Sequence, residues 1–209
     1  LDAQPRVDTL LHNAGALYPE RHTTPDGTEL TVAAQVVGPF LLTSLLFERL
    51  RLSAPSRVIT VSSGGMYAAS LDVENLEMGA DYRGTEQYAR AKRAQVTLNE
   101  LWAERFGGSG VRFHAMHPGW ADTPGVATSL PTFRKLTGPL LRSPEQGADT
   151  IVWLAADDGE PATTTGRFWH DRRVRGTHRL PATRRCDTPA ERERLWTWCV
   201  EHAGIDPGA

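Results

Sequence analysis

The sequence predicts an α/β fold, in which helices cover both faces of a parallel sheet. Three short apolar runs, at residues 7–12, 57–62 and 111–117, alternate with long segments of helical pattern. This alternation is typical of parallel sheets, because a crossover between parallel strands needs a connection about as long as a helix. Each run ends in Asn, Ser or Pro-Gly residues. Since open α/β sheets bind ligands beyond the carboxyl ends of their strands, we expect a site there.

Composition and turn signals support each predicted strand. Residues 57–62 (RVITVS) are apolar and β-branched, as in a buried strand. Residues 7–12 (VDTLLH) lead into the turn signal Asn13-Ala14-Gly15, and residues 111–117 lead into Pro118-Gly119. Residues 166–170 (GRFWH) are predicted to form a fourth strand, at the edge of the sheet.

Four helices are predicted, at residues 26–52, 85–106, 143–156 and 188–202. The first contains Pro39, which should kink it or remove one backbone hydrogen bond. The third begins with Ser143-Pro144-Glu145-Gln146, a helix-start pattern with a cap and a capping glutamine. Residues 64–84 and 121–137 are expected to be irregular, and residues 172–185 to form an arginine-rich loop.

The composition indicates one globular domain, residues 1–209, with 40% apolar residues. The 23 basic and 25 acidic residues give a net charge of −2, which does not favour nucleic-acid partners. The apolar runs are shorter than a membrane span, and the first residues lack the features of a secretory signal. Cys186 and Cys199 form neither a metal-binding pattern nor a disulfide framework. We therefore expect a cytoplasmic protein without a bound metal or a membrane span.

The residues most suggestive of chemistry are Tyr88 and Lys92, in the segment YARAK. Residues four apart share a helix face, so the lysine should lie beside the phenol. A nearby ammonium lowers the pKa of a tyrosine from about 10, which suits proton transfer with a carbonyl oxygen. The chain has only two lysines, which makes this position more informative.

Three further segments are placed at predicted strand ends. A serine hydroxyl after the second predicted strand, from Ser62 or Ser63, could bind a substrate oxygen and orient it toward Tyr88. Gly15 would allow a ligand to approach the backbone closely, and the Pro118–Thr123 segment would present backbone groups and a hydroxyl over the same pocket. Taken alone, each of these segments can be an ordinary turn, and for Asn13-Ala14-Gly15 that is the better explanation.

Together these segments resemble the short-chain dehydrogenase/reductase family. The resemblance rests on HNAG at 12–15, VSS at 61–63, YARAK at 88–92 and PGWADT at 118–123, in the family's order, and it extends over residues 7–170. The interval from Ser63 to Tyr88 is 88 − 63 = 25 positions, longer than in compact members. This interval is similar to that of the retinol-dehydrogenase-like branch. The resemblance implies the C-terminal part of a Rossmann-like fold, with about four strands.

The resemblance also implies roles for individual residues. Tyr88 would be the general acid/base, Lys92 would lower its pKa and contact the nicotinamide ribose, and Ser63 would hold the substrate oxygen. The implied cofactor is NAD or NADP, lined by Asn13, Ala14, Gly15, Tyr88, Lys92, Pro118, Gly119 and Thr123. Gln35 stands where the family has a relay asparagine, and its extra methylene could displace the relay water.

The family's glycine-rich phosphate loop should precede the strand at residues 7–12, and this chain does not contain it. We expect a fragment, an open edge on that strand and weak binding of NAD(P) by the chain alone. Two functions follow: an oxidoreductase acting on a carbonyl or secondary alcohol, or a non-catalytic module for binding or assembly.

The expected partners are a small-molecule substrate and further copies of the chain in a homo-oligomer, the latter by resemblance alone. A lipophilic substrate is suggested by apolar residues in the two irregular segments: Met66, Tyr67, Leu71, Met78, Val126, Leu130 and Phe133.

Overall fold

The computed structural model describes residues 5–120 and 141–208 and contains one five-stranded sheet. The strands lie in the order β1 (Thr9–His12), β2 (Ser56–Val61), β3 (Val111–Met116), β4 (Arg167–His170) and β5 (Arg173–Val174). The first four strands are parallel, and β5 runs antiparallel to β4. The predicted α/β fold with a largely parallel sheet is therefore confirmed. Its parallel strands all end at one edge of the sheet, next to the predicted site residues.

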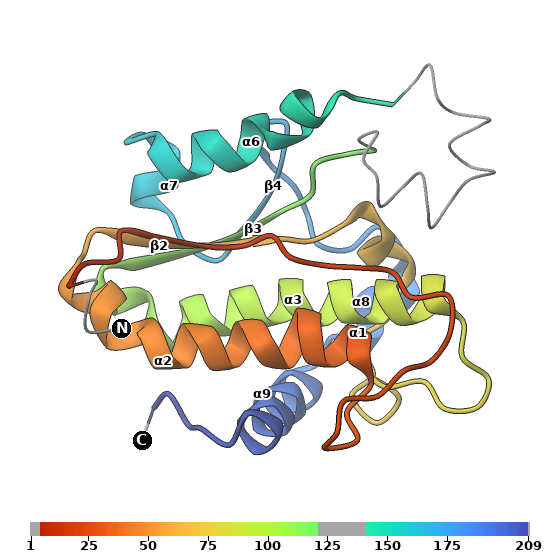
Figure 1. Cartoon of the computed structure of the whole chain (residues 1–209). Helices are drawn as coiled ribbons and strands as arrows, with labels where there is room; N and C mark the ends of the chain where they lie inside the picture. The colour runs from red at the N-terminus through yellow and green to blue at the C-terminus, as the bar shows by residue number, and fades with distance from the viewer. Residues whose placement is uncertain (1–4, 121–140, 209) are drawn as a thin grey trace.

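Helices cover both faces of the sheet (Figure 1). One face carries α1 (Leu30–Val32), a π-helical turn (Ala33–Val37), α2 (Gly38–Leu52) and α3 (Gly84–Phe106). The other face carries α6 (Pro144–Ala156) and α7 (Glu160–Thr163). The remaining elements are 3-10 turns at Gly64–Ala68 and Gly107–Ser109, α8 (Pro181–Cys186) and α9 (Pro189–Ala203). Helix α9 packs outside α2 and α3, so this side of the sheet is two helical layers deep.

The first predicted helix begins later than expected and is interrupted as expected. It starts at Leu30, where the Glu29 side chain accepts a hydrogen bond from the Val32 backbone, while residues 24–27 form a turn. Just before Pro39 the helix widens into a five-residue π-helical turn. Because proline has no N–H, the regular α-helical hydrogen-bond pattern cannot continue through it. This turn places Gln35 on the inner side of the helix, where it is fully buried.

The arginine-rich segment at residues 172–185 is not simply a loop, and this prediction was wrong. Asp171 and Arg172 both have positive φ angles, 54° and 53°, and reverse the chain tightly so that β5 returns along β4. Helix α8 then begins at Pro181, which suits a first helical position. The predicted edge strand β4 consequently has a short neighbour on its outer side. By contrast, the predicted helix start at Ser143 is confirmed as a complete capping box with Gln146.

The core has an apolar layer on each side of the sheet. Below it, Phe40, Trp102 and Trp196 bring their ring centroids within 5.1–5.4 Å of one another. Above it, Leu154 of α6 packs with residues from three strands: Ile59, Val61, Met116 and Trp169. Burying each large side chain contributes roughly 1.5–3 kcal/mol. This packing fixes α3 against the sheet and thereby fixes the side chains that α3 presents at the strand ends.

The continuous helical stretch Leu30–Leu52 has a mean hydropathy of 1.8, high enough by length and composition to cross a membrane. Core helices of globular proteins have the same property. In this structure the stretch packs on the sheet and α9 through Phe40, Leu46, Phe47 and Leu50. Its outer side leaves Leu42 and Leu45 exposed at 43% and 52%.

Candidate active site

Helix α3 holds Tyr88 and Lys92 side by side. The Lys92 ammonium lies 5.2 Å from the centroid of the Tyr88 ring. Lys92 is only 2% exposed, and its Nζ donates a hydrogen bond to the Val61 carbonyl at the end of β2, at 3.0 Å. Burial penalises the charged form and lowers the pKa of Lys92 to about 7. This lysine can therefore gain or lose a proton near neutral pH.

The pKa of Tyr88 differs from the expectation. Burial raises it above the ordinary value, while a hydrogen bond with the Ser63 side chain acts in the opposite direction. The sequence argument relied on Lys92 to lower this pKa. Here Lys92 lies over the ring and is itself poorly charged near neutrality, so desolvation of the phenol dominates. Ser63 is thus the group that favours the phenolate in this arrangement.

The two serines after β2 have different surroundings. The Ser62 hydroxyl is buried and donates to the Lys92 carbonyl at 3.0 Å, which ties α3 to β2. The Ser63 hydroxyl accepts from the Gly65 N–H at 3.2 Å and caps the 3-10 turn that follows. Its interaction with Tyr88 places it in the same site. The structure therefore brings Ser63, Tyr88 and Lys92 together and gives Ser62 a structural contact.

The residues after β1 lie close to Lys92. Asn13, Ala14 and Gly15 are exposed at the strand end. A Cβ atom on Gly15 would stand 2.9 Å from Gln35 Oε1 and 3.4 Å from Lys92 Nζ. Glycine therefore lets the backbone approach both polar side chains closely. We call the exposed backbone of residues 13–15, together with the neighbouring Lys92 Nζ, the Gly15 cradle.

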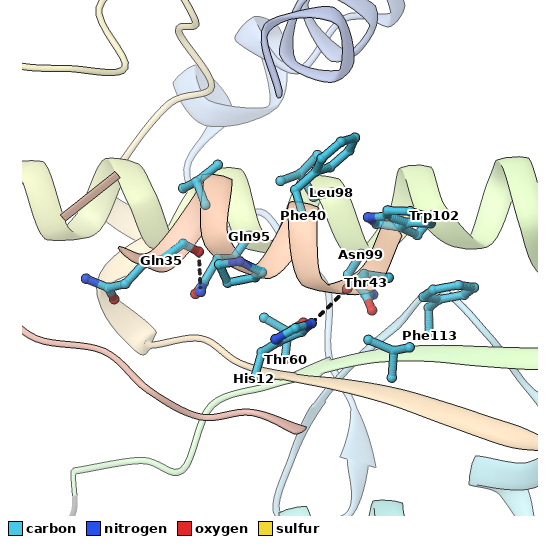
Figure 2. A pocket seen from close by; sticks show the side chains of 13 residues that line it. His12, Gln35, Phe40, Thr43, Thr60, Gln95, Leu98, Asn99, Trp102 and Phe113 are labelled. Carbon is cyan, nitrogen blue, oxygen red and sulfur yellow. Dashed lines mark hydrogen bonds between the residues drawn. The ribbon is translucent and has the colours of Figure 1, made fainter. Parts of the chain in front are cut away.

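Gln35 lies next to this cradle. Its Nε2 donates to the Ala16 carbonyl at 2.7 Å, which leaves Oε1 buried without a hydrogen-bond partner among the described residues. On the inner side, the Gln35 backbone carbonyl accepts from Gln95 Nε2, also at 2.7 Å (Figure 2). Gln35 therefore connects the segment after β1 to Gln95 in α3.

The third strand end carries Pro118 and Gly119. Gly119 has a φ of 76°, and its N–H donates to His117 Nδ1 at 3.3 Å. His117 stacks on His170 with ring centroids 3.9 Å apart, and burial lowers its pKa to about 4. Thr123, the last predicted cofactor contact, lies outside the described residues.

Arg93 of α3 fixes the loop that follows Ser63. This buried guanidinium donates to the carbonyls of Met66, Ala69 and Thr177, at 2.9–3.0 Å. The apolar residues expected to face a lipophilic substrate, Met66, Tyr67, Leu71 and Met78, are instead buried in the protein. Val126, Leu130 and Phe133 lie outside the described residues. Packing against α3 therefore explains the apolar character of this loop without a ligand.

Sequence reasoning missed three buried polar residues near the site: Gln95, Asn99 and His117. Gln95 and Asn99 continue the face of α3 that carries Tyr88 and Lys92, at steps of three and four residues, so the helical spacing could have identified them. His117 was placed only as the last residue of the predicted strand at residues 111–117. Within residues 5–120 and 141–208, no cluster of three or more His, Cys, Asp or Glu is placed to bind a metal.

Comparisons with known proteins agree with this geometry. The sequence model of a family described as enoyl-(acyl carrier protein) reductase matches residues 2–170. Human dehydrogenase/reductase SDR family member 12 is 43% identical over 191 residues, which make up 91% of this chain and 59% of the relative. The chain belongs to the short-chain dehydrogenase/reductase family. Human retinol dehydrogenase 13 is 34% identical over an alignment of 215 positions, which covers 99% of this chain and 63% of that protein. The suspected retinol-dehydrogenase-like branch is thus confirmed.

Solved structures of other proteins share the fold. An uncharacterized protein from Mycobacterium paratuberculosis superposes with a TM-score of 0.74 at 24% identity, covering 98% of this chain and 70% of that one. A short-chain dehydrogenase from Escherichia coli, solved with NADPH, gives a TM-score of 0.60 at 22% identity, covering 79% and 63%. These similarities establish the Rossmann-like architecture. The chain spans 59% of the length of the human family member 12 that it matches.

Proposed function

We propose that the protein is an NAD(P)-dependent oxidoreductase that transfers a hydride between the nicotinamide and a carbonyl or secondary alcohol. The observation that carries the proposal is the convergence of Ser63, Tyr88 and Lys92 at the ends of parallel strands. Membership of the short-chain dehydrogenase/reductase family supports the same reaction class.

The residues present fit the nicotinamide-ribose end of such a cofactor. Lys92 has three N–H donors and uses one of them on Val61, and Gly15 keeps the adjacent backbone free of a side chain. Asn13, Ala14, Pro118 and Gly119 would line the same end. When bound, the cofactor supplies or accepts the hydride. Either NAD or NADP satisfies these contacts.

The protein's own residues handle the proton. During reduction, the Tyr88 hydroxyl would donate its proton to the substrate oxygen, while the Ser63 hydroxyl would hold that oxygen in place. The resulting phenolate is stabilised by Ser63 and by a protonated Lys92, whose pKa of about 7 allows it to be recharged from solvent near neutrality. In the oxidation direction, the same groups accept the proton from the alcohol.

We further propose a lipophilic substrate, supported by the names of the retinol dehydrogenases among the relatives. A homo-oligomer is also proposed, in which the exposed Leu42 and Leu45 of α2 pack against a second copy. Sedimentation of the parent protein and of a Leu42→Glu, Leu45→Glu variant tests this, because only the parent should associate.

The test of function is hydride transfer from cofactor deuterated at the nicotinamide C4 to a panel of aliphatic, aromatic and retinoid aldehydes. Tyr88→Phe should lower turnover by about 10²–10⁴-fold, since only the proton-transferring hydroxyl is lost. Tyr82→Phe is the matched control: it also removes a half-buried hydroxyl, one that contacts Glu29 at the start of α1. Cofactor binding without any turnover would instead favour a binding or assembly module.

A further inference from the structure

Helix α3 carries a polar stripe that continues inward from the proposed site. Tyr88, Lys92, Gln95 and Asn99 follow one another at steps of four, three and four residues and so share one helix face. Lys92, Gln95 and Asn99 are all at least 95% buried. Buried amides are nearly always hydrogen-bonded, so the partners of Gln95 indicate what this position does.

Gln95 takes over a hydrogen bond that the backbone of the first helix cannot make. In an α-helix the Gln35 carbonyl would accept from the N–H four residues later, but that residue is Pro39, which has none. Gln95 Nε2 donates to this carbonyl instead, at 2.7 Å (Figure 2). Because a carbonyl only accepts, the contact also fixes which end of the Gln95 amide faces Gln35.

The same contact fixes the position of Gln35 relative to Lys92. The side chain of Gln35 extends from the π-helical turn away from Gln95, donates to the Ala16 carbonyl and lies against Gly15. Lys92 Nζ lies against the same glycine. A shift of the turn would therefore move the Gln35 amide oxygen, the negative end of a dipole, relative to the ammonium.

We propose that Gln95 is a positioning residue: by supplying the donor that Pro39 lacks, it holds the π-helical turn so that Gln35 Oε1 and the Lys92 ammonium keep their places against Gly15. This assignment rests on the proposed function, in which Lys92 sustains proton transfer at Tyr88. The claim that Gln95 positions Gln35 relative to Lys92 concerns only these three residues. It can therefore be tested without substrate or cofactor.

The experiment is an NMR titration of Lys92 in the full chain, labelled at the lysine side chain. The sequence has two lysines, and a Lys135→Arg variant assigns the signals. Gln95→Met keeps the side-chain length but removes the donor, so the pKa of Lys92 should fall by at least about half a unit as the Gln35 dipole moves away. Gln95→Asn, one methylene shorter, provides a second variant with the same expectation if the methionine variant folds poorly.

Two controls separate positioning from general packing. Gln87→Met removes two other buried hydrogen bonds of α3, to Met78 and Leu76, and should weaken folding about tenfold or more without moving the Lys92 titration. Adding Pro39→Ala to Gln95→Met restores a backbone N–H. This double variant should return the pKa of Lys92 most of the way to its value in the parent protein. An unchanged or raised Lys92 pKa in a folded Gln95 variant, or no recovery with Pro39→Ala, would overturn the inference. Absence of turnover in the parent protein would instead count against the proposed reaction.

Discussion

The buried Lys92 lowers the free energy of unfolding of the protein, and replacing this residue should show the effect directly. The side chain is 2% exposed, and burial lowers its pKa from 10.5 to about 7. The unfolded chain therefore binds more protons than the folded chain between these two values. Stability rises with pH across that window, and the full cost is present below pH 7. We predict that Lys92→Met gives a more stable protein near neutral pH that no longer supports turnover.

The magnitude follows from the shift of about 3.5 units. At pH 7.5 the buried charge costs about 4 kcal/mol, since one pKa unit corresponds to about 1.4 kcal/mol. Losing the hydrogen bond to the Val61 carbonyl offsets about 1–3 kcal/mol of the gain, because that oxygen is left unpaired. The expected net stabilisation by Lys92→Met is about 2 kcal/mol. Between pH 6 and pH 9, the lysine should add about 3 kcal/mol to the stability of the parent protein.

Urea denaturation of the parent protein and the variant at pH 6, 7.5 and 9 provides the measurement. The parent should gain stability with rising pH more steeply than the variant, and the two curves should converge at high pH. Parallel curves would show that Lys92 has an ordinary pKa in the folded protein, and the argument from its burial would be wrong. A variant less stable than the parent at every pH would lead to the same conclusion.

Three further predictions concern neighbouring groups. Ser63→Ala should raise the pKa of Tyr88, so in aldehyde reduction the alkaline fall of the pH–rate profile should move to higher pH, with a loss of about 10–10³-fold in turnover. An unmoved profile would exclude Ser63 from the site. Gly15→Ala should leave the melting temperature nearly unchanged but weaken cofactor binding about tenfold or more. The reason is that the new Cβ would stand 2.9 Å from Gln35 Oε1. Calorimetric titration with NADH and NADPH measures the change in binding. His114, whose pKa burial lowers to about 4, should cost about 2–3 kcal/mol of stability as the pH falls from 6.5 to 4, because the unfolded chain is protonated first. A His114→Gln variant should lack that slope in urea denaturation.

The sequence predicts those parts of the fold that repeat a simple pattern. The first three strands and the helix at 84–106 are identified by apolar runs and helical spacing. Residues 171–174 are missed because two consecutive positive-φ residues, an aspartate and an arginine, make the reversal that forms β5. Aspartate tolerates a positive φ, but an arginine beside it does not signal such a turn. The start of the first helix is misplaced because Thr24-Pro25-Asp26-Gly27 forms a separate turn.

For the candidate site, sequence order was sufficient to predict that Ser63, Tyr88 and Lys92 lie together, but not their electrostatics. Proximity of a lysine to a tyrosine predicts a lowered phenol pKa only when the lysine is charged and close to the hydroxyl. Both the charge of Lys92 and its distance from the hydroxyl depend on how deeply α3 lies against the sheet. That depth depends in turn on the packing of α2 and α3 together. The link from Gln95 to the Gln35 carbonyl joins residues 60 positions apart, so it depends on the tertiary structure.

The attachment of the C-terminal segment limits how this protein can be recombined with its relatives. The family match ends at residue 170, but Trp196 of α9 completes the aromatic cluster with Phe40 and Trp102. Arg93, next to Lys92, also reaches across to the Thr177 carbonyl. A chimera joined at residue 170 would therefore take Trp196 of α9 from one parent and the aromatic rings that it packs against from the other. It would also separate Arg93 from the Thr177 carbonyl of its own parent. Exchange of the C-terminal segment between family members should succeed only when the inner faces of α2 and α3 are exchanged with it.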